Sequence, residues 1–417
     1  MKNLNKNFTQ KIIILFCCVV FFCVHCFAQI NPELKKDSII INPKDSVKEK
    51  DLGDVYRSIF KPQKEAKNDS ANTQRKYQIA FVPAVGYTLQ TGFAAVLSAN
   101  MAYQTDTGYN TKISSVNTSF TYSQYKQTII PFVANIWTKG NRWNIISDFR
   151  YINYPSNVFG LGGRTDPNKG VTINFQALKI HQAILKSLSN DFYIGAGFYL
   201  DKFWDIKAID PLTRTENKQL QKELGTTESA VGWAFRVLHD TRKNQINPDG
   251  GSYYNIVFRK NLKDLGSDSA SQTLLIDART YFRFPDKSKN VLAFWTLDWL
   301  SPSQTPPYLL LPSTGWDDQY NTGRGYIQGR FRGKTMIYFE SEYRFGITRN
   351  GLLGGVAFTN LQSFSSDISN QFSSVFIGYG IGLRIKLNKH SGANLCLDYG
   401  WGQNGSGGFF VNLGEVF

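Results

Sequence analysis

Apolar and polar residues alternate with a period of two from residue 77 to residue 417. In 375–387 the odd positions are apolar, and the even positions include three glycines, Arg384 and Lys386. In 337–345 the odd positions are mostly apolar or aromatic, and the even positions include Glu340 and Glu342. A period of two places successive side chains on opposite faces of a β-strand, so this pattern predicts strands with one apolar and one polar face.

Breaks at Gly, Pro, Asn and Asp divide this region into sixteen candidate strands. They lie near 77–89, 92–104, 110–123, 127–138, 141–152, 170–187, 191–206, 225–238, 251–260, 272–285, 290–300, 334–345, 351–361, 373–387, 390–400 and 407–417. An even number is typical of single-chain bacterial barrels and puts both ends of the sheet on one side of the membrane. With a periplasmic N-terminus, the long connection 301–333 between the eleventh and twelfth strands faces outward.

Two architectures satisfy this alternation. A soluble sandwich turns its apolar face inward against a second sheet, whereas a barrel in lipid turns that face outward and leaves charges in a wet lumen. Periodicity alone does not separate them, and the N-terminal segment and the terminal strand decide for the barrel. We therefore expect an all-β protein, a transmembrane antiparallel β-barrel of about sixteen strands over 77–417.

Residues 1–28 are typical of a secretory signal peptide. Three lysines precede an almost unbroken apolar run over 12–28, and Ala28 offers a cleavage site. The alternative is a single transmembrane anchor, but a run of about 17 residues is at the short limit for a span. A lipoprotein signal is disfavoured because no small residues precede Cys23 or Cys26. We expect cleavage and an outer-membrane destination.

Residues 29–76 are rich in Lys, Asp, Asn, Pro and Ser and have too few apolar residues to fold alone. We expect a short disordered periplasmic segment. Within it, apolar residues at helical spacing allow a short amphipathic helix over 51–64. A flexible tether is favoured over a helix docked at the barrel mouth, because so short a helix is marginal by itself.

Composition agrees with a barrel and excludes several other classes. Mean hydropathy is −0.29 and aromatics make up 14% of the chain, which suits alternating faces with interfacial aromatic girdles. The net charge of +15 is spread without a compact Lys/Arg run, so no nucleic-acid partner is indicated. Four of five cysteines lie in the signal segment, leaving only Cys396 and no disulfide framework. The histidines lack metal-ligand spacing, and we expect no metal, no cofactor and no catalytic residue.

Two further patterns in the sequence are weak. The run 159–164, FGLGGR, has a faint phosphate-loop pattern but lacks the strand-to-helix context, so an extracellular glycine-rich loop is favoured. A barrel lipid hydrolase would need a serine and a histidine together on the outer face. Ser187 near His181 is the nearest pairing, and the sequence shows no third group to orient them.

Three segments carry a resemblance to a known family. The first is Asp240, Thr241 and Arg242, followed by Pro248 and Gly250, between the eighth and ninth strands. Pro248 and Gly250 favour a turn, and Asp240 can pair with Arg242. This segment is expected to form a long periplasmic hairpin turn.

The second segment is Gly323, Arg324, Gly325 and Tyr326 in the long connection, with Glu340 and Glu342 on the strand that follows. Glycines let a backbone pack closely, and an arginine inside a lumen needs a carboxylate. Glu340 and Glu342 stand on the predicted lumen face and are candidate partners of Arg324.

The third segment is the terminal strand, in which Phe409, Val411, Leu413 and Phe417 are expected to form the lipid face of the seam to the first strand. Glu415 interrupts this apolar row near the periplasmic end, where a carboxylate could still reach water.

Together these segments resemble the bacterial surface antigen barrel of the BamA/TamA family, whose members insert other barrels or move polypeptide across outer membranes. The resemblance implies a loop folded into the lumen to support the barrel's shape. An Asp on the thirteenth strand commonly receives the loop arginine in that family. The matching residue here is Asn360, which can accept a hydrogen bond but no charge pair.

The resemblance also implies a role in membrane insertion or polypeptide export rather than an enzyme activity. Family members carry periplasmic POTRA domains, and the fewer than 50 residues between Ala28 and Tyr77 leave no room for one, so we expect a POTRA-less member. Expected partners are the lipid bilayer, client outer-membrane proteins and a separate periplasmic protein, with the barrel itself a monomer. A passive pore or structural barrel is the alternative.

Overall fold

The computed structural model describes residues 48–60, 77–88, 91–106, 111–209, 224–302, 304–318, 320–365, 371–372, 374–389 and 391–417. The signal peptide over 1–28, most of the segment 29–76 and His390 lie outside these residues. The cleavage of the signal peptide and the disorder expected over most of 29–76 therefore stay predictions.

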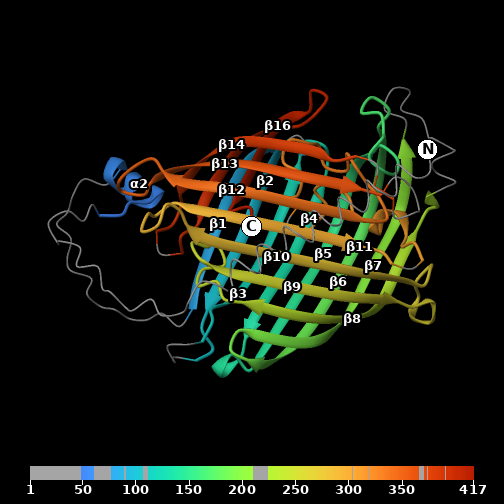
Figure 1. Ribbon diagram of the computed structural model, residues 1–417, viewed down its shortest axis with the longest axis horizontal. Helices are drawn as coiled ribbons and strands as arrows, with labels where there is room; N and C mark the ends of the chain where they lie inside the picture. Colours follow the sequence, from blue (N-terminus) through green and yellow to red (C-terminus); the bar gives the residue numbers. More distant parts are fainter. Residues whose placement is uncertain are drawn as a thin grey trace. The chain divides into compact units, whose positions relative to one another are not determined.

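Sixteen strands form one sheet over the described residues. They are β1 (Tyr77–Thr88), β2 (Gly92–Tyr103), β3 (Ser114–Ser123), β4 (Thr128–Trp137), β5 (Trp143–Val158), β6 (Val171–Ser189), β7 (Phe192–Ile209), β8 (Glu228–Asp240), β9 (Gly251–Asn261), β10 (Ser271–Arg283), β11 (Val291–Leu300), β12 (Met336–Gly346), β13 (Leu353–Phe364), β14 (Phe376–Lys386), β15 (Asn394–Trp401) and β16 (Gly407–Leu413). Each pairs with the next strand along the chain, and in Figure 1 β2–β7 run behind β8–β14, so the sheet curves back on itself.

The prediction of an all-β, antiparallel fold is confirmed. Among the described residues no ladder joins β16 to β1, so closure of the sheet at this seam stays a prediction. No helix in the described part of the chain is long and apolar enough to cross a membrane.

Strand β5 continues to Val158, six residues beyond its predicted end, and passes through Pro155. Proline lacks the N–H that a ladder needs. The ladder with β4 ends at the pair Asn153–Thr128, so Pro155 is paired on one side only, with Asn174 of β6. The predicted strand ends too early, at 152, because proline normally breaks a strand and the sequence alone does not show where the neighbouring strand stops.

The last strand ends earlier than predicted, at Leu413. Gly414 follows with a φ of 91°, in the left-handed region that glycine adopts readily, and the chain leaves the strand direction there. Val416 and Phe417 are buried, whereas Phe409 and Leu413 are exposed as a lipid face requires. The prediction that Phe417 lies on the lipid face is therefore wrong.

The two faces of the strands differ as the alternation predicted. On β14, Ile377, Tyr379 and Ile381 are exposed, whereas Gly378, Gly380 and Arg384 are buried. On β12, Tyr338, Glu340 and Glu342 are fully buried, so the polar face points inside. We expected a wet lumen around these charges, but the connection between β11 and β12 covers them.

The interior next to the C-terminal strands is filled mainly by aromatic side chains. Trp295 of β11, Tyr338 of β12 and Phe364 of β13 pack with Tyr326 and Phe331 of the β11–β12 connection and with Phe417. The core thus lies inside the curve of the sheet and is built from strand residues, the inward connection and the C-terminal tail.

A short helix, α2 (Leu52–Phe60), precedes the sheet within the region predicted to be capable of a helix. Lys389, in the turn between β14 and β15, pairs with Asp54 of α2 at 2.8 Å. The helix is therefore docked at the end of the sheet that carries the β12–β13 and β14–β15 turns. In Figure 1 it lies beside the ends of β12–β14. The docked helix differs from the flexible tether that the sequence favours, because contacts with the turns stabilise a helix too short to be stable by itself.

Candidate functional site

The connection between β11 and β12, residues 301–335, folds into the interior of the sheet. Arg332 forms isolated β-bridges with Gly162 of the β5–β6 connection and with Ser313. Its guanidinium donates to the carbonyl oxygens of Tyr308, at 3.0 Å, and Leu311, at 3.2 Å. These bonds fix the connection, called the inner loop below, against two distant parts of the chain.

Two glycines let the inner loop lie against the sheet. Gly323 and Gly325 have φ values of 78° and 104°, and a Cβ on Gly325 would stand 2.7 Å from the carbonyl oxygen of Trp401. A Cβ on Gly400 of β15 would in turn stand 2.6 Å from the nitrogen of Gly325. Larger residues would force the two backbones apart, so glycine on both sides brings Arg324 to the wall.

Arg324 is buried with 1% of its surface exposed and is held by three carboxylates. Its guanidinium donates to Glu340 and Glu342 of β12 and, at 2.5 Å, to Asp398 of β15. The predicted pairing of the loop arginine with Glu340 and Glu342 agrees with this geometry. The planar guanidinium has several donors, so one side chain can bridge strands that lie on either side of β13 and β14.

Further charged and polar groups support the three carboxylates. Arg344 donates to Glu342 at 2.7 Å, Arg384 pairs with Asp398, and Tyr338 donates to Glu340. Removal of one member would leave a buried charge without a partner, so these groups act as one network.

The C-terminal tail takes part in this network. Glu415 accepts a hydrogen bond from Arg384 at 2.8 Å, and the carbonyl oxygen of Phe417 accepts one from Arg344 at 2.9 Å. The carboxylate of Glu415 is buried rather than reaching water, which corrects its predicted role. The charged site thus extends from the inner loop through β12, β14 and β15 to the end of the chain.

Asn360 lies on β13 beneath the loop but does not receive the arginine side chain. Its amide Nδ2 donates to the backbone carbonyl oxygen of Arg324 at 2.9 Å. Asp398, two strands further on, supplies the third carboxylate for the arginine side chain. Asn360 was the third possible partner of the arginine in the sequence, as a hydrogen-bond acceptor, and that prediction is wrong: its amide donates to the backbone of Arg324 and the guanidinium binds carboxylates instead.

A second group of contacts holds the inner loop to the opposite part of the sheet. Asp318 pairs with Lys179 of β6 at 2.6 Å, and its carbonyl oxygen accepts from Arg150 of β5 at 2.6 Å. The loop is therefore anchored at two places by opposite charges, an arginine toward β12 and β15 and an aspartate toward β5 and β6.

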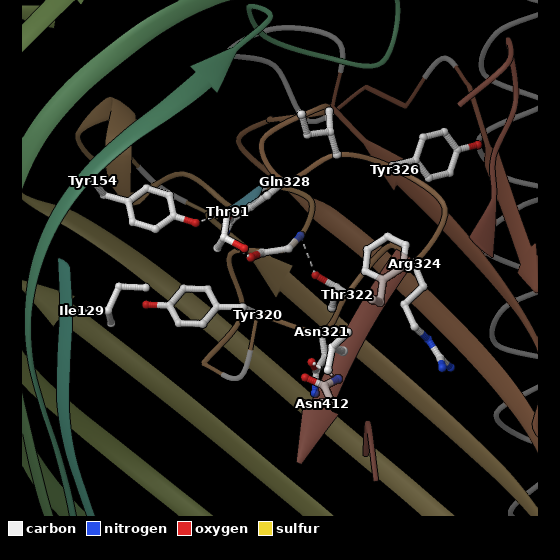
Figure 2. Close-up of a pocket in the computed structure, with 14 residues that line it drawn as sticks. Thr91, Ile129, Tyr154, Tyr320, Asn321, Thr322, Arg324, Tyr326, Gln328 and Asn412 are labelled. Atoms are coloured by element: carbon white, nitrogen blue, oxygen red, sulfur yellow. Dashed lines mark hydrogen bonds between the residues drawn. The ribbon is translucent and has the colours of Figure 1, made fainter. Parts of the chain in front are cut away.

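A cavity of about 220 Å³ lies beside the inner loop. Figure 2 shows Tyr154, Tyr320 and Gln328 around it, with the guanidinium of Arg324 pointing away from them. Tyr154 donates to Gln328 at 2.6 Å, and Asn412 of β16 donates to Asn321 at 2.8 Å. The polar groups at the cavity bind one another and join the loop to the terminal strand.

The turn 241–250 lies between β8 and β9, where it was predicted. Arg242 pairs with Asp240 at 2.9 Å, and Thr241 shares hydrogen bonds with Ser252. The left-handed glycine is Gly251 rather than Gly250, and Pro248 is buried.

This turn also reaches the C-terminal strands. The carbonyl oxygen of Ile246 accepts from the nitrogen of Glu415 at 3.1 Å, and Asn244 donates to Ser391. The turn is therefore tied to the tail as well as to its own hairpin, a contact that no sequence signal indicated.

The structure does not bring Ser187 and His181 together. His181 faces inward on β6, where its Nε2 lies 2.9 Å from Asp201, and Ser187 donates to the carbonyl oxygen of Ser189. An orienting acid is thus present, contrary to expectation, but the serine six residues along the strand is out of reach. The run 159–164 belongs to the β5–β6 connection and precedes a strand rather than a helix.

Asp398 and Arg384 are site residues that the sequence analysis above does not predict. Both lie at even positions of strands whose odd positions are apolar, and a charge on that face must point inside. This alternation is the signal that could have identified them.

No protein-family model and no curated protein matches the sequence. The fold is similar to that of BamA from Haemophilus ducreyi lacking POTRA domains 1–3, with a TM-score of 0.51 and 13% identity over 80% of this chain and 69% of that chain. It is also similar to CdiB from Acinetobacter baumannii, with a TM-score of 0.52 and 15% identity over 82% of this chain and 60% of that one. A third similar structure is CdiB from Escherichia coli, with a TM-score of 0.52 and 11% identity over 80% of this chain and 62% of that chain.

The chain has the fold of the BamA and CdiB barrels. It spans less than two thirds of the length of either CdiB chain, and the low identities establish the fold alone. The predicted resemblance to a BamA-type barrel is confirmed at this level.

Proposed function

We propose that this protein is an outer-membrane barrel that assists the insertion of outer-membrane proteins or the export of polypeptide. The observation that carries the proposal is the buried Arg324, which an inward loop places against Glu340, Glu342 and Asp398 inside a sheet of the BamA and CdiB fold. The exposed apolar faces of β14 and β16 support a position in the lipid bilayer.

In this proposal the charged network supports the shape of the wall rather than reacting with a substrate. The inner loop is tied to β12 and β15 by Arg324 and to β5 and β6 by Asp318, so it braces two sides of the sheet. The strands at the seam, β1 and β16, are in contact but have no ladder between them among the described residues. A braced wall beside a seam without a ladder is suited to accept an extended polypeptide there.

The proposed location is the outer membrane, with the N-terminal segment in the periplasm. The proposed partners are the lipid bilayer, client outer-membrane proteins and a separate periplasmic protein, and the barrel is proposed to act as a monomer. A lipid hydrolase is not supported, because Ser187 and His181 stand apart on β6.

Depletion with complementation tests the function. The outer-membrane proteome is measured after depletion of the native protein and expression of wild type, Arg324→Ala or Arg283→Ala. Arg283 pairs with Asp249 at an exposed site and serves as the matched control. We expect client barrels to fall severalfold on depletion and in Arg324→Ala, and to recover with wild type and Arg283→Ala. An unchanged proteome on depletion would contradict the proposal.

A further inference from the structure

Three arginine side chains meet around one tyrosine on the inner face of the sheet. Arg236 of β8 donates to the hydroxyl of Tyr253 on β9 at 3.5 Å. The guanidiniums of Arg242, in the β8–β9 turn, and Arg279, on β10, lie 4.3 and 5.3 Å from the centre of the same ring. Guanidiniums are attracted to the face of an aromatic ring, so Tyr253 helps to hold these like charges together. The three arginines are called the arginine cluster below.

Two arginines of the cluster are neutralised by carboxylates of the same strands. Arg242 donates two hydrogen bonds to Asp240, at 2.9 and 3.1 Å. Arg279 donates two to Asp277, at 2.8 and 2.7 Å. A pair of parallel bonds from one guanidinium to one carboxylate is a strong and geometrically fixed contact. Both carboxylates are therefore engaged.

The third arginine, Arg236, has only neutral partners. Its Nε donates to the amide oxygen of Asn255 at 2.6 Å, and it forms no ion pair with a carboxylate of the described residues. Asp318 of the inner loop interacts with Arg236 through charge but pairs directly with Lys179, at 2.6 Å. An inward cation without a counter-ion attracts an anion, because a charge removed from water is costly unless it is paired.

The arginine cluster can be reached from inside the sheet. Arg236, Tyr253 and Arg279 are each half-buried rather than sealed. Arg242 belongs to the β8–β9 turn, so the cluster lies near the end of the sheet that carries this turn. The proposed function places that end in the periplasm, and a ligand would approach from there.

The charge and the place of the cluster indicate the class of ligand. A planar guanidinium binds a carboxylate or a phosphate through two parallel hydrogen bonds. A lipid headgroup would have to leave the bilayer to reach an inward side chain, so an acidic polypeptide is favoured over a headgroup phosphate. The protein's own N-terminal segment has no net negative charge, since residues 29–47 carry three acidic and three basic side chains, and residues 61–76 carry two and five.

We infer that the arginine cluster binds an acidic segment of the client polypeptide, with a glutamate or aspartate carboxylate on Arg236. This inference rests on the proposed function, because only a barrel that handles polypeptide brings a client segment to its interior. A partner docked outside on the turns would not reach inward side chains, so the client is the source. The bound carboxylate supplies the counter-ion that Arg236 lacks.

Isothermal titration calorimetry on the purified full-length protein in detergent micelles tests the site. The probes are a short peptide of alternating glutamate and glycine, the same peptide with glutamine in place of glutamate, and inorganic phosphate. We expect the glutamate peptide to bind roughly tenfold more tightly than the glutamine peptide, a difference of about 1.4 kcal/mol. Equal affinities would overturn the inference. Binding of phosphate without binding of the glutamate peptide would also overturn it, because the ligand would then be a phosphate.

Asn255→Asp supplies the missing counter-ion from within the protein. The amide oxygen of Asn255 already accepts from Arg236, so a carboxylate of nearly the same shape takes its place. We expect this variant to keep the heat-modifiable gel mobility of wild type and to bind the glutamate peptide roughly tenfold more weakly. Arg236→Lys keeps a cation at the site and should bind the peptide more tightly than Asn255→Asp does. Wild-type affinity in Asn255→Asp, or the reverse order of the two variants, would count against the site.

Asn350→Asp, in the β12–β13 turn at the same end of the sheet, is the matched control. Oδ1 of Asn350 accepts from the nitrogen of Leu352 at 3.1 Å, and a carboxylate keeps that bond. We expect its affinity for the glutamate peptide to stay within about twofold of wild type, because salt screens a charge placed away from β8–β10. Equal losses in Asn255→Asp and Asn350→Asp would show repulsion by added charge alone and overturn the site.

The calorimetry needs no client, so its outcome is independent of the depletion experiment. Absence of peptide binding, with client barrels that still fall on depletion, would overturn the arginine cluster as a site and leave the proposed function standing. Peptide binding with an unchanged proteome on depletion would overturn the proposed function and, with it, the client as the ligand.

Discussion

At the scale of single residues, Arg324 is the position where a substitution should cost most. Arg324→Ala leaves Glu340, Glu342 and Asp398 buried without their shared partner, and breaking a buried ion pair costs about 3–5 kcal/mol. Arg324→Lys keeps the charge but cannot bridge all three carboxylates, so an intermediate loss is expected. Urea titration in lipid vesicles measures the free energy of unfolding. Arg283→Ala, at an exposed pair, should change it by less than about 1 kcal/mol, and a similar loss in both variants would contradict the assignment.

Asn360 allows a test in which the family pattern and this structure predict opposite results. Asn360→Asp would introduce the carboxylate that the BamA/TamA resemblance leads one to expect at this position. Here it would set that carboxylate against the carbonyl oxygen of Arg324 and remove the Nδ2 donor, so we expect a loss of about 1–3 kcal/mol. The same urea titration measures it. A gain in stability would show that Arg324 turns toward β13 instead.

Glu340 and Glu342 were predictable because alternation on one strand defines which side chains point inside, and Arg324 was predictable from the family resemblance of its loop. Asp398, which faces the same interior from β15, was not predictable as their partner, because the distance between strands that are not neighbours depends on the curvature of the sheet. No periodicity within one strand contains that curvature. The partner of Arg324 in this chain therefore had to come from the structure.

At the scale of elements, substitutions in the C-terminal segment test whether its last residue packs inside the barrel or faces lipid. Phe417 packs on Trp295 and Tyr281, and Phe417→Ala would leave a cavity that costs about 3–5 kcal/mol. Leu413 faces outward, and lipid would fill the space left by Leu413→Ala, so about 2 kcal/mol or less is expected there. The midpoint of heat unfolding compares the two variants. Equal shifts would place the Phe417 ring in lipid.

Helix α2 should respond to pH only in acid. Hydrogen bonds from Lys389 and Arg57 hold the pKa of Asp54 well below its usual value. A lowered pKa in the folded state means that docking is fully stabilised above the usual aspartate pKa of about 4 and weakens as pH falls below it. Amide hydrogen exchange of α2, corrected for its intrinsic pH dependence, should show constant protection from about pH 8 to pH 5 and less below about pH 4. Loss of protection between pH 8 and pH 5 would indicate another titrating group.

Element boundaries were predictable where a turn residue and the end of the neighbouring strand coincide. Strand β9 begins at Gly251 as predicted, directly after the turn 241–250. Pro155 and Phe417 show the two ways in which the prediction failed: a proline is tolerated where one neighbour has ended, and an apolar residue at the right spacing leaves the strand after a glycine. Both outcomes depend on what lies beside the strand.

At the scale of the whole molecule, alternation predicted the number and order of strands but not the contents of the lumen. The resemblance of Gly323, Arg324, Gly325 and Tyr326 to the BamA/TamA loop implied a loop in the lumen. Nothing in the spacing indicated that Asp318 would bind Lys179 on the far side, that the tail would join it, or that the β8–β9 turn would reach Glu415. These contacts fill the interior, and they bear directly on whether the barrel conducts.

Planar-bilayer conductance tests the filled interior. Wild type should show little steady current, because the inner loop is anchored both at Arg324 and at Asp318. Replacement of 313–332 by a short Gly/Ser linker removes both anchors and should raise the conductance severalfold. Shortening the β9–β10 connection at 263–266, which lies apart from the loop anchors, should leave it unchanged. A wild type that conducts as well as the loop deletion would favour a passive pore, because a braced loop that blocks ions cannot coexist with an open channel through the same interior.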